Sequence, residues 1–428
     1  MPTVKESKLA PGIVLLPVRV INTIKKSTSP KLKTVVLVDP LSGGHHEAYM
    51  RFFIRFFYEH GWKVYILFPE TKELKVWAAM EFENLDKVIV ESYSIQESSS
   101  NLRNWGKLFR TPVIWRDLHR RVKGMSSHKA DLVYFTWLDS FLDSYYPFPI
   151  QSWIFPHNWS GLYFHPKHLR YNNQYLSERA KISDIDIVLK SRNCVGLTIH
   201  DRALLEGMKY RYEKNHIVTL PEFADLTSPD PKNEYAIEIK KRSGGRLVIG
   251  MLGLAPHQGI QKFCELHSSS DPERYFFVYV GVPHVDQFND EERKAWNSTH
   301  NLDNQVRINR WLKEGEEYNS VFSALDVPFL VYRDFTSSSN RLTKAAHFRK
   351  LVLASNKYLV GEDVRNYDLG EVVDEDNLED YLKGIELLFD KIKNKNYKSR
   401  YWNVYTEMNS YVKFEEELEK FTKQLVFS

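Results

Sequence analysis

Glycine and histidine residues are concentrated in residues 39–47, directly after an apolar, β-branched run. Glycines let backbone N–H groups approach a ligand closely, and the start of a following helix attracts anions. We therefore expect Gly43 and Gly44 to bind the phosphate or sugar of a ligand. The spacing does not match the glycine fingerprint of dinucleotide-binding proteins. The alternative is a tight turn that leads into a helix at His45 or His46.

A second candidate is His157, in the glycine-containing segment 155–161. The apolar run at 152–155 predicts a strand, and a histidine after a strand can bind substrate or transfer a proton. His157 is therefore the predicted catalytic residue. A purely structural histidine is the alternative. A metal site shared with His45 and His46 is not indicated, because no carboxylate or cysteine stands at clear ligand spacing from them.

The third segment, residues 332–346, follows another apolar run and combines serines with basic residues. Serine hydroxyl groups cap helices, and free N–H groups at a helix start bind phosphate. The alternative is an ordinary serine N-cap with no ligand. The residues predicted to bind a diphosphate here are Ser337, Ser338, Ser339, Arg341 and Lys344.

Short apolar runs alternate with helical spacing along the chain, and these elements must position the three segments. The predicted strands of the first half are residues 34–39, 63–68, 87–91, 132–136, 152–155, 195–199 and 216–220. Those of the second half are residues 247–251, 275–280, 306–309, 327–331, 350–354 and 370–373. This order predicts an α/β protein with two doubly wound, Rossmann-like parallel sheets. Ligands of such sheets bind at the carboxyl ends of the strands, so two domains facing a cleft would place a ligand between them.

Length and composition agree with two globular domains. The chain has 428 residues, about the length of two domains. Its two cysteines exclude a disulfide framework. Its formal net charge of +4 is too small to indicate a nucleic-acid partner. No apolar run is long enough to span a membrane, so a cytoplasmic protein is expected. The predicted parts are a basic leader at 1–33, domains at 34–225 and 226–393, and C-terminal helices at 394–428.

Residues 101–129 combine basic and aromatic side chains, with eight lysines and arginines against one acidic residue. Such a stretch can lie on an anionic membrane or attract an anionic acceptor. Pro112 is expected to interrupt any long helix here. The alternative is that the aromatic residues belong to the core and the charges to a solvated face. The predicted acceptor or membrane contacts are Arg103, Trp105, Arg110, Trp115, Arg120 and Arg121.

Taken in their order along the chain, the segments at residues 39–47, 155–161 and 332–346 resemble those of the GT-B glycosyltransferases, specifically their large retaining, metal-independent group. The resemblance covers about residues 33–428. It rests on the glycine loop at 42–45, on His157 as the acceptor-side histidine, and on the interdomain segment 220–225. It also rests on the glycine-containing segment 249–259. The family's Glu-Ala-x-x-x-Gly-x-Pro-Val-Val-Ala motif aligns without gaps on residues 344–354.

Several charged residues of the family pattern are replaced. The arginine and lysine that hold the donor diphosphate fall nearest to Leu254 and Gln258, and the paired glutamates fall on Thr336 and Lys344. Either the serine loop has taken over phosphate binding, with charge from Arg341 or Lys344, or the donor site has been lost.

The resemblance implies transfer of a sugar from a UDP- or GDP-sugar to a glycan or lipid-linked acceptor, with retention of configuration. It implies a role in polysaccharide biosynthesis, no metal or other cofactor, and C-terminal helices that return to the first domain. Arg310 and Trp311 would hold the nucleobase, and the protein would be peripheral on the inner face of the membrane. The alternatives are a nucleotide-sugar epimerase and a non-catalytic partner that binds or scaffolds another transferase.

Overall fold

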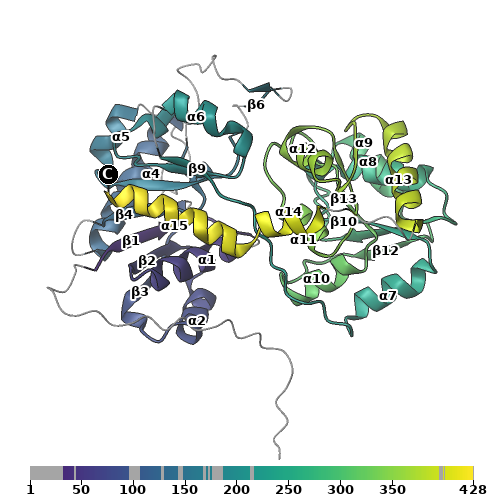
Figure 1. The fold of residues 1–428 in the computed structure, drawn as a ribbon, viewed down its shortest axis with the longest axis horizontal. Helices are drawn as coiled ribbons and strands as arrows, with labels where there is room; N and C mark the ends of the chain where they lie inside the picture. The colour runs from purple at the N-terminus through teal and green to yellow at the C-terminus, as the bar shows by residue number, and fades with distance from the viewer. Residues whose placement is uncertain are drawn as a thin grey trace, which may run out of the picture. The chain divides into compact units, whose positions relative to one another are not determined.

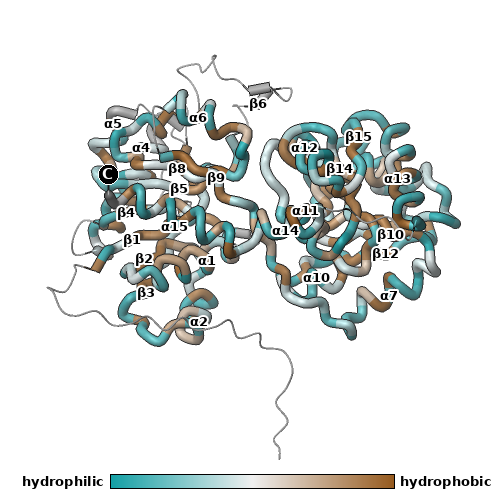
Figure 2. The backbone as a smooth tube through the Cα atoms, in the orientation of Figure 1, coloured by the Kyte–Doolittle hydropathy of each residue, from teal (hydrophilic) through white to brown (hydrophobic). Residues whose placement is uncertain are grey.

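The computed structural model contains two separate parallel β-sheets, each covered by helices on both faces (Figure 1). It describes residues 32–42, 45–95, 107–126, 130–142, 148–166, 170–171, 174–175, 187–212, 216–394, 399 and 401–427. The hydrophobic residues follow the strands of both sheets (Figure 2). The predicted fold class is confirmed. The residue boundaries predicted for the domains stay predictions.

The first sheet has seven strands in the order β3-β2-β1-β4-β5-β8-β9. All of its strand pairs are parallel. The strands are β1 (Thr34–Val38), β2 (Lys63–Phe68), β3 (Val88–Ser92), β4 (Leu132–Phe135), β5 (Trp159–Tyr163), β8 (Leu197–Ile199) and β9 (Ile217–Thr219). Its helices are α1 (His45–Glu59), α2 (Thr71–Glu81), α4 (Lys107–Met125), α5 (Phe148–Ile154) and α6 (Leu205–Tyr212). A short antiparallel pair joins β6 (Arg170–Tyr171) and β7 (Gln174–Tyr175).

One face of the first sheet is covered by α1 together with the last helix, α15 (Tyr411–Phe427), drawn in yellow in Figure 1. Aromatic side chains of α1 fill this layer, and the ring of Phe52 lies 4.7 Å from that of Phe414 in α15. The spacing of these aromatic residues places them on one face of α1, which makes the helix amphipathic. The buried aromatic residues of α1 are Tyr49, Phe52, Phe53, Phe56 and Phe57.

The second sheet has six strands in the order β12-β11-β10-β13-β14-β15, also with parallel pairs throughout. They are β10 (Leu247–Leu252), β11 (Tyr275–Val280), β12 (Gln305–Ile308), β13 (Val327–Leu330), β14 (Val352–Ser355) and β15 (Gly370–Val373). Its helices are α7 (Glu234–Ser243), α8 (Ile260–Ser269), α9 (Asp290–Ser298), α10 (Glu316–Ser323), α11 (Asn340–His347), α12 (Tyr358–Asn366), α13 (Leu378–Lys393) and α14 (Trp402–Met408). One hydrophobic cluster packs on each face of this sheet.

The predicted strand at 152–155 is wrong, because these residues end helix α5 and the strand β5 begins at Trp159. A short apolar run does not distinguish a buried strand from a helix. Gly161 also weakens the strand pattern, although the structure requires glycine there: a Cβ atom would lie 2.8 Å from the Cβ of Phe135.

Helix α4 continues through Pro112, contrary to the predicted interruption. Proline removes one helical hydrogen bond, and the buried face of the helix compensates. Trp115 and Leu118 are fully buried in the core against the first sheet. The predicted membrane or acceptor contact of Trp115 is therefore wrong, because its indole reaches no surface.

Candidate functional site

The carboxyl end of β1 carries a buried carboxylate, Asp39, that holds an imidazole. Asp39 is fully buried and accepts hydrogen bonds from the N–H of Leu41 and the hydroxyl of Thr136, both at 3.0 Å. His46, in the first turn of α1, places its Nδ1 atom 3.0 Å from the same carboxylate. The ends of β1 and β4 are thus joined by one polar cluster.

A second cluster lies at the carboxyl ends of β4 and β5. Asp139 accepts hydrogen bonds from the backbone N–H groups of Phe164, at 2.9 Å, and His165, at 2.8 Å. The ring of Trp137 stacks on Phe164, with centroids 3.9 Å apart, and lies 4.3 Å from the ring of His46. Two histidines, His46 and His165, therefore flank one tryptophan at the edge where parallel sheets bind ligands.

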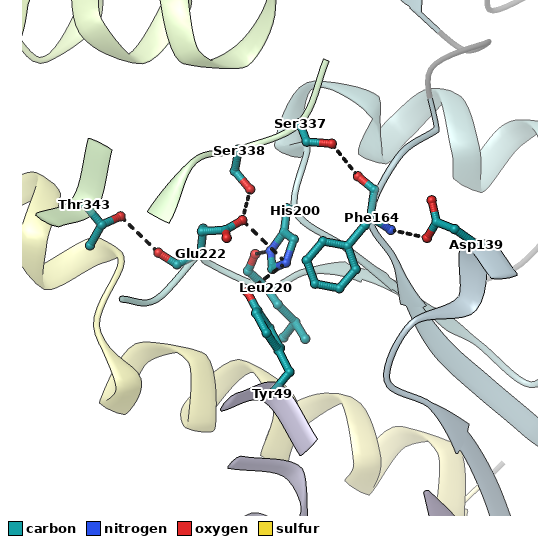
Figure 3. A network of polar contacts seen from close by, with 9 residues as sticks. All are labelled: Tyr49, Asp139, Phe164, His200, Leu220, Glu222, Ser337, Ser338 and Thr343. Atoms are coloured by element: carbon teal, nitrogen blue, oxygen red, sulfur yellow. Dashed lines mark hydrogen bonds and ion pairs between the residues drawn. The ribbon is translucent and has the colours of Figure 1, made fainter. Parts of the chain in front are cut away.

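The serine loop that precedes α11 is bonded to the first sheet and to the segment after β9 (Figure 3). The Ser337 hydroxyl donates to the backbone oxygen of Phe164 at 2.7 Å, and Ser338 donates to the carboxylate of Glu222. The Thr343 hydroxyl donates to the backbone oxygen of Glu222 at 3.0 Å. The carboxyl ends of strands from both sheets therefore meet around this loop.

Glu222 and His200 continue this network into the first sheet. The Nδ1 atom of His200 lies 2.9 Å from the backbone oxygen of Leu220, and its Nε2 atom lies 3.2 Å from the Tyr49 hydroxyl. The Glu222 carboxylate lies 3.7 Å from the same Nε2 atom. Both nitrogens of His200 are therefore engaged inside the protein.

Arg341 is a cation that meets no carboxylate in the part of the chain that the structure describes. Its guanidinium lies 3.5 Å from the hydroxyl of Tyr332, and across the described ranges it forms no ion pair. Burial disfavours its charge, but the phenol groups of Tyr318 and Tyr332 hold the pKa of the guanidinium above its usual value. The positive charge at the start of α11 is retained and not neutralised by an acidic side chain.

Lys344, one turn further along α11, is fully buried and fully bonded. Its ammonium group donates to the backbone oxygen of Asp225 at 2.6 Å, to Oδ1 of Asn319 at 2.7 Å and to Glu314 at 2.7 Å. An ammonium group has three donors, so none is left for a ligand. Its role as a phosphate ligand stays a prediction that this bonding does not favour.

Two buried oxygens at the carboxyl ends of the neighbouring strands β10 and β13 have no hydrogen-bond partner in the described part of the chain. They are Oε1 of Gln258 and the hydroxyl of Thr336. The end of the Gln258 side chain lies against Gly253, whose positive φ of 95° favours glycine. Buried polar groups are normally paired, so a polar ligand would satisfy them. Leu254, in the same loop, is fully buried.

The two predicted nucleobase residues follow β12. The indole of Trp311 is 63% exposed. Arg310 is bonded to the hydroxyl of Tyr235 at 3.0 Å and to the carboxylate of Glu317. The structure therefore leaves an open aromatic ring at this strand end, whereas the neighbouring arginine is already engaged.

His157 lies at the opposite edge of the first sheet from this site, because it precedes β5 and does not follow it. It is buried, and its Nε2 atom lies 2.9 Å from Nδ1 of His119 in α4. The strand expected before His157 is therefore wrong, and its catalytic role stays a prediction that this position does not favour. The residue at the carboxyl end of β5 is His165, which sequence reasoning missed because it placed the strand too early.

Other predicted site residues fall outside this cluster. Gly43, Gly44, Arg103 and Trp105 lie outside the described residues, and only the backbone of Arg110 is described. Arg120 is exposed on α4, and Arg121 pairs with Asp117 at 3.1 Å. In the part of the chain that the structure describes, no group of three or more metal-ligating side chains comes together. Nor does any helix there have the length and apolar character needed to cross a membrane.

No protein-family model and no curated protein matches the sequence. Solved structures do match. HepE of Anabaena, in complex with UDP and glucose, is 12% identical with a TM-score of 0.62, over 92% of this chain and 100% of that one. Sucrose-phosphate synthase of Thermosynechococcus elongatus is 12% identical with a TM-score of 0.63, over 92% and 99%. WaaG, a glycosyltransferase involved in lipopolysaccharide biosynthesis, is 11% identical with a TM-score of 0.57, over 92% and 100%. The resemblance to GT-B glycosyltransferases is confirmed at the level of the fold.

Proposed function

We propose that this chain, which has the GT-B fold, transfers a sugar from a UDP- or GDP-sugar to a hydroxyl group of a glycan or lipid-linked acceptor. HepE is described in complex with UDP and with UDP-glucose, which supports a nucleotide-sugar ligand here. The observation that carries the proposal is Arg341, a cation at the start of α11 that pairs with no carboxylate among the described residues. A diphosphate is the anion that best fits such a position.

The proposed chemistry is stabilisation of the leaving diphosphate. When the sugar–phosphate bond breaks, negative charge grows on the diphosphate oxygens, and a fixed cation with helix N–H groups lowers the energy of that state. Within the described residues, the Ser339 side chain does not cap α11, and its hydroxyl lies 3.2 Å from that of Tyr332. The unpaired oxygens of Thr336 and Gln258 supply further polar contacts on neighbouring loops.

With the diphosphate at Arg341, positions for the sugar and the nucleobase of the donor follow. We propose that the sugar lies against the carboxyl ends of β4 and β5, where His165 replaces His157 as the histidine of the site. The exposed indole of Trp311 would stack on the nucleobase. The stereochemical outcome proposed is retention, as the resemblance implies, and NMR of the anomeric proton in the product would test it.

The test is binding of UDP, UDP-glucose, GDP and GDP-mannose, measured by calorimetry and by the melting temperature. A true donor present at 100 times its Kd should raise the melting temperature by about 3 °C. AMP serves as the control nucleotide. Absence of any shift with all four ligands contradicts the proposal. Binding without hydrolysis or transfer to glycans would favour the alternative of a non-catalytic partner.

We further propose that α4 contacts an anionic membrane that carries the acceptor. Arg116, Arg120 and Lys123 are exposed on this helix. Replacing all three with glutamate should weaken binding to vesicles containing phosphatidylglycerol by about 100-fold or more. Flotation assays measure this, with phosphatidylcholine vesicles as the neutral comparison.

The matched control replaces three exposed lysines in and just before α7, beside the second sheet, with glutamate. These are Lys232, Lys240 and Lys241. Equal losses in both triple variants would indicate a general effect of net charge and contradict a role of α4.

A further inference from the structure

We propose that His46, held by Asp39, binds a hydroxyl group of the donor's sugar. This inference rests on the proposed function and assigns one residue to the transferred group. The sequence position of His46 does not by itself indicate a role, because a histidine in the first turn of a helix can be an ordinary surface residue.

The carboxylate of Asp39 determines which nitrogen of His46 carries a proton. Asp39 is fully buried at the end of β1, and its oxygens lie 3.0 and 3.2 Å from Nδ1 of His46. An ionised carboxylate only accepts hydrogen bonds, so Nδ1 must donate. In the neutral imidazole the lone pair is then on Nε2, which becomes an acceptor suited to a hydroxyl group.

The Nε2 atom of His46 has no partner among the residues that the structure describes. The imidazole side chain is 15% exposed and lies against the ring of Trp137, with centroids 4.3 Å apart. A carboxylate and an indole thus hold the ring in place, and one polar atom stays open. Carboxylates orient metal-binding histidines in the same way and leave the second nitrogen for the ligand.

Structural histidines of the same chain are bonded differently. His267 uses both nitrogens inside the second domain, at 2.9 Å from the Tyr279 hydroxyl and 3.0 Å from Oδ1 of Asn304. His200 also engages both, with the backbone oxygen of Leu220 and the Tyr49 hydroxyl. His46 differs because the protein fixes its orientation without using its second nitrogen.

The position of His46 favours the sugar over the nucleotide. Ser337, in the loop proposed to hold the diphosphate, donates to the backbone oxygen of Phe164 at 2.7 Å. The ring of Phe164 stacks on Trp137 at 3.9 Å, and Trp137 contacts His46. A sugar bonded to the diphosphate would extend along this row of side chains, with hydroxyl groups that can donate to Nε2.

The test compares the affinities of UDP and UDP-glucose by calorimetry in two variants of His46. In His46→Phe, the ring contact with Trp137 is kept and both nitrogens are removed. We expect the Kd of UDP-glucose to rise about three- to tenfold, as for one lost hydrogen bond, and the Kd of UDP to stay unchanged. His46→Gln should recover part of the loss, because its amide oxygen can accept a hydrogen bond.

The matched control is His60→Phe, directly after the other end of α1, where the histidine ring lies tilted against that of Phe56 with centroids 4.2 Å apart. It should change neither affinity. An unchanged Kd of UDP-glucose in folded His46→Phe would overturn the proposal, as would an equal loss for UDP. Failure of the unaltered protein to bind UDP at all would instead contradict the proposed function, and this assignment with it.

Discussion

Replacing Arg341 with methionine is expected to weaken UDP binding by about 10- to 100-fold. Hydrogen bonds to a charged group contribute about 1.5–3 kcal/mol, and the guanidinium would make such bonds to the diphosphate. Methionine keeps most of the length of the side chain, so the contacts of its stem with neighbouring residues are preserved. Titration calorimetry measures the change directly.

The stability of the ligand-free protein distinguishes this role from a structural one. Arg341 has the Tyr332 hydroxyl at 3.5 Å, and no carboxylate balances its charge among the described residues. The raised pKa of Arg341 means that the fold favours its charge, but through phenol groups and not through an ion pair, so removing it should lower the melting temperature by no more than about 3 °C. The rise on adding UDP should be lost in addition.

Two further variants complete the experiment. Arg341→Lys keeps the charge but loses the planar fork that matches phosphate oxygens, so an intermediate affinity is expected. Arg365→Met removes an arginine of α12 that donates to the backbone oxygen of Asn356, and it should bind UDP normally. Normal UDP affinity in Arg341→Met would refute the proposed diphosphate site.

The sequence predicted the two sheets because their strands are short, apolar and separated by helical spacing. It failed at β5, where Ser160 and Gly161 break the β-branched pattern and α5 supplies a competing apolar run. That single error moved the expected histidine from His165 to His157. The sequence position of a loop residue is informative only when the strand before it is placed correctly.

The site was predicted in part, for physical reasons that differ between residues. The serine loop and the β1–α1 segment were identified because each follows a strand, which is a local signal. The bonding of Asp39 by Thr136, from another strand, depends on which strands become neighbours. Among the described residues, Arg341 meets phenol groups and no carboxylate, whereas Lys344 is fully bonded. This difference depends on residues distant in the sequence, so the sequence did not distinguish the two cations.

Replacing Lys344 with methionine should lower the free energy of unfolding by about 3 kcal/mol, because the backbone oxygen of Asp225 and Oδ1 of Asn319 lose a charged, buried donor. The ammonium group joins α11 to Asp225 and to Asn319 and Glu314, all within 2.7 Å. Methionine fills a similar volume but leaves these oxygens without their donor. Urea unfolding gives the change, and UDP affinity at low temperature should stay near that of the unaltered protein.

The control is Lys391→Met, which breaks a surface pair with Glu371 at 2.6 Å. An exposed pair contributes under about 1 kcal/mol, so this variant should be nearly neutral. A similarly small loss in Lys344→Met would contradict the structural role.

Lys344→Glu tests why the glutamate of the family pattern is replaced here. The new carboxylate would face Glu314 and the backbone oxygen of Asp225, where every neighbour within 2.7 Å of the native ammonium group is an acceptor. Like charges and unpaired acceptors both destabilise, so this variant should unfold more easily than Lys344→Met. A Lys344→Glu variant as stable as the unaltered protein would show that this environment tolerates either charge. The pairing with Glu314 would then not explain why position 344 is a lysine.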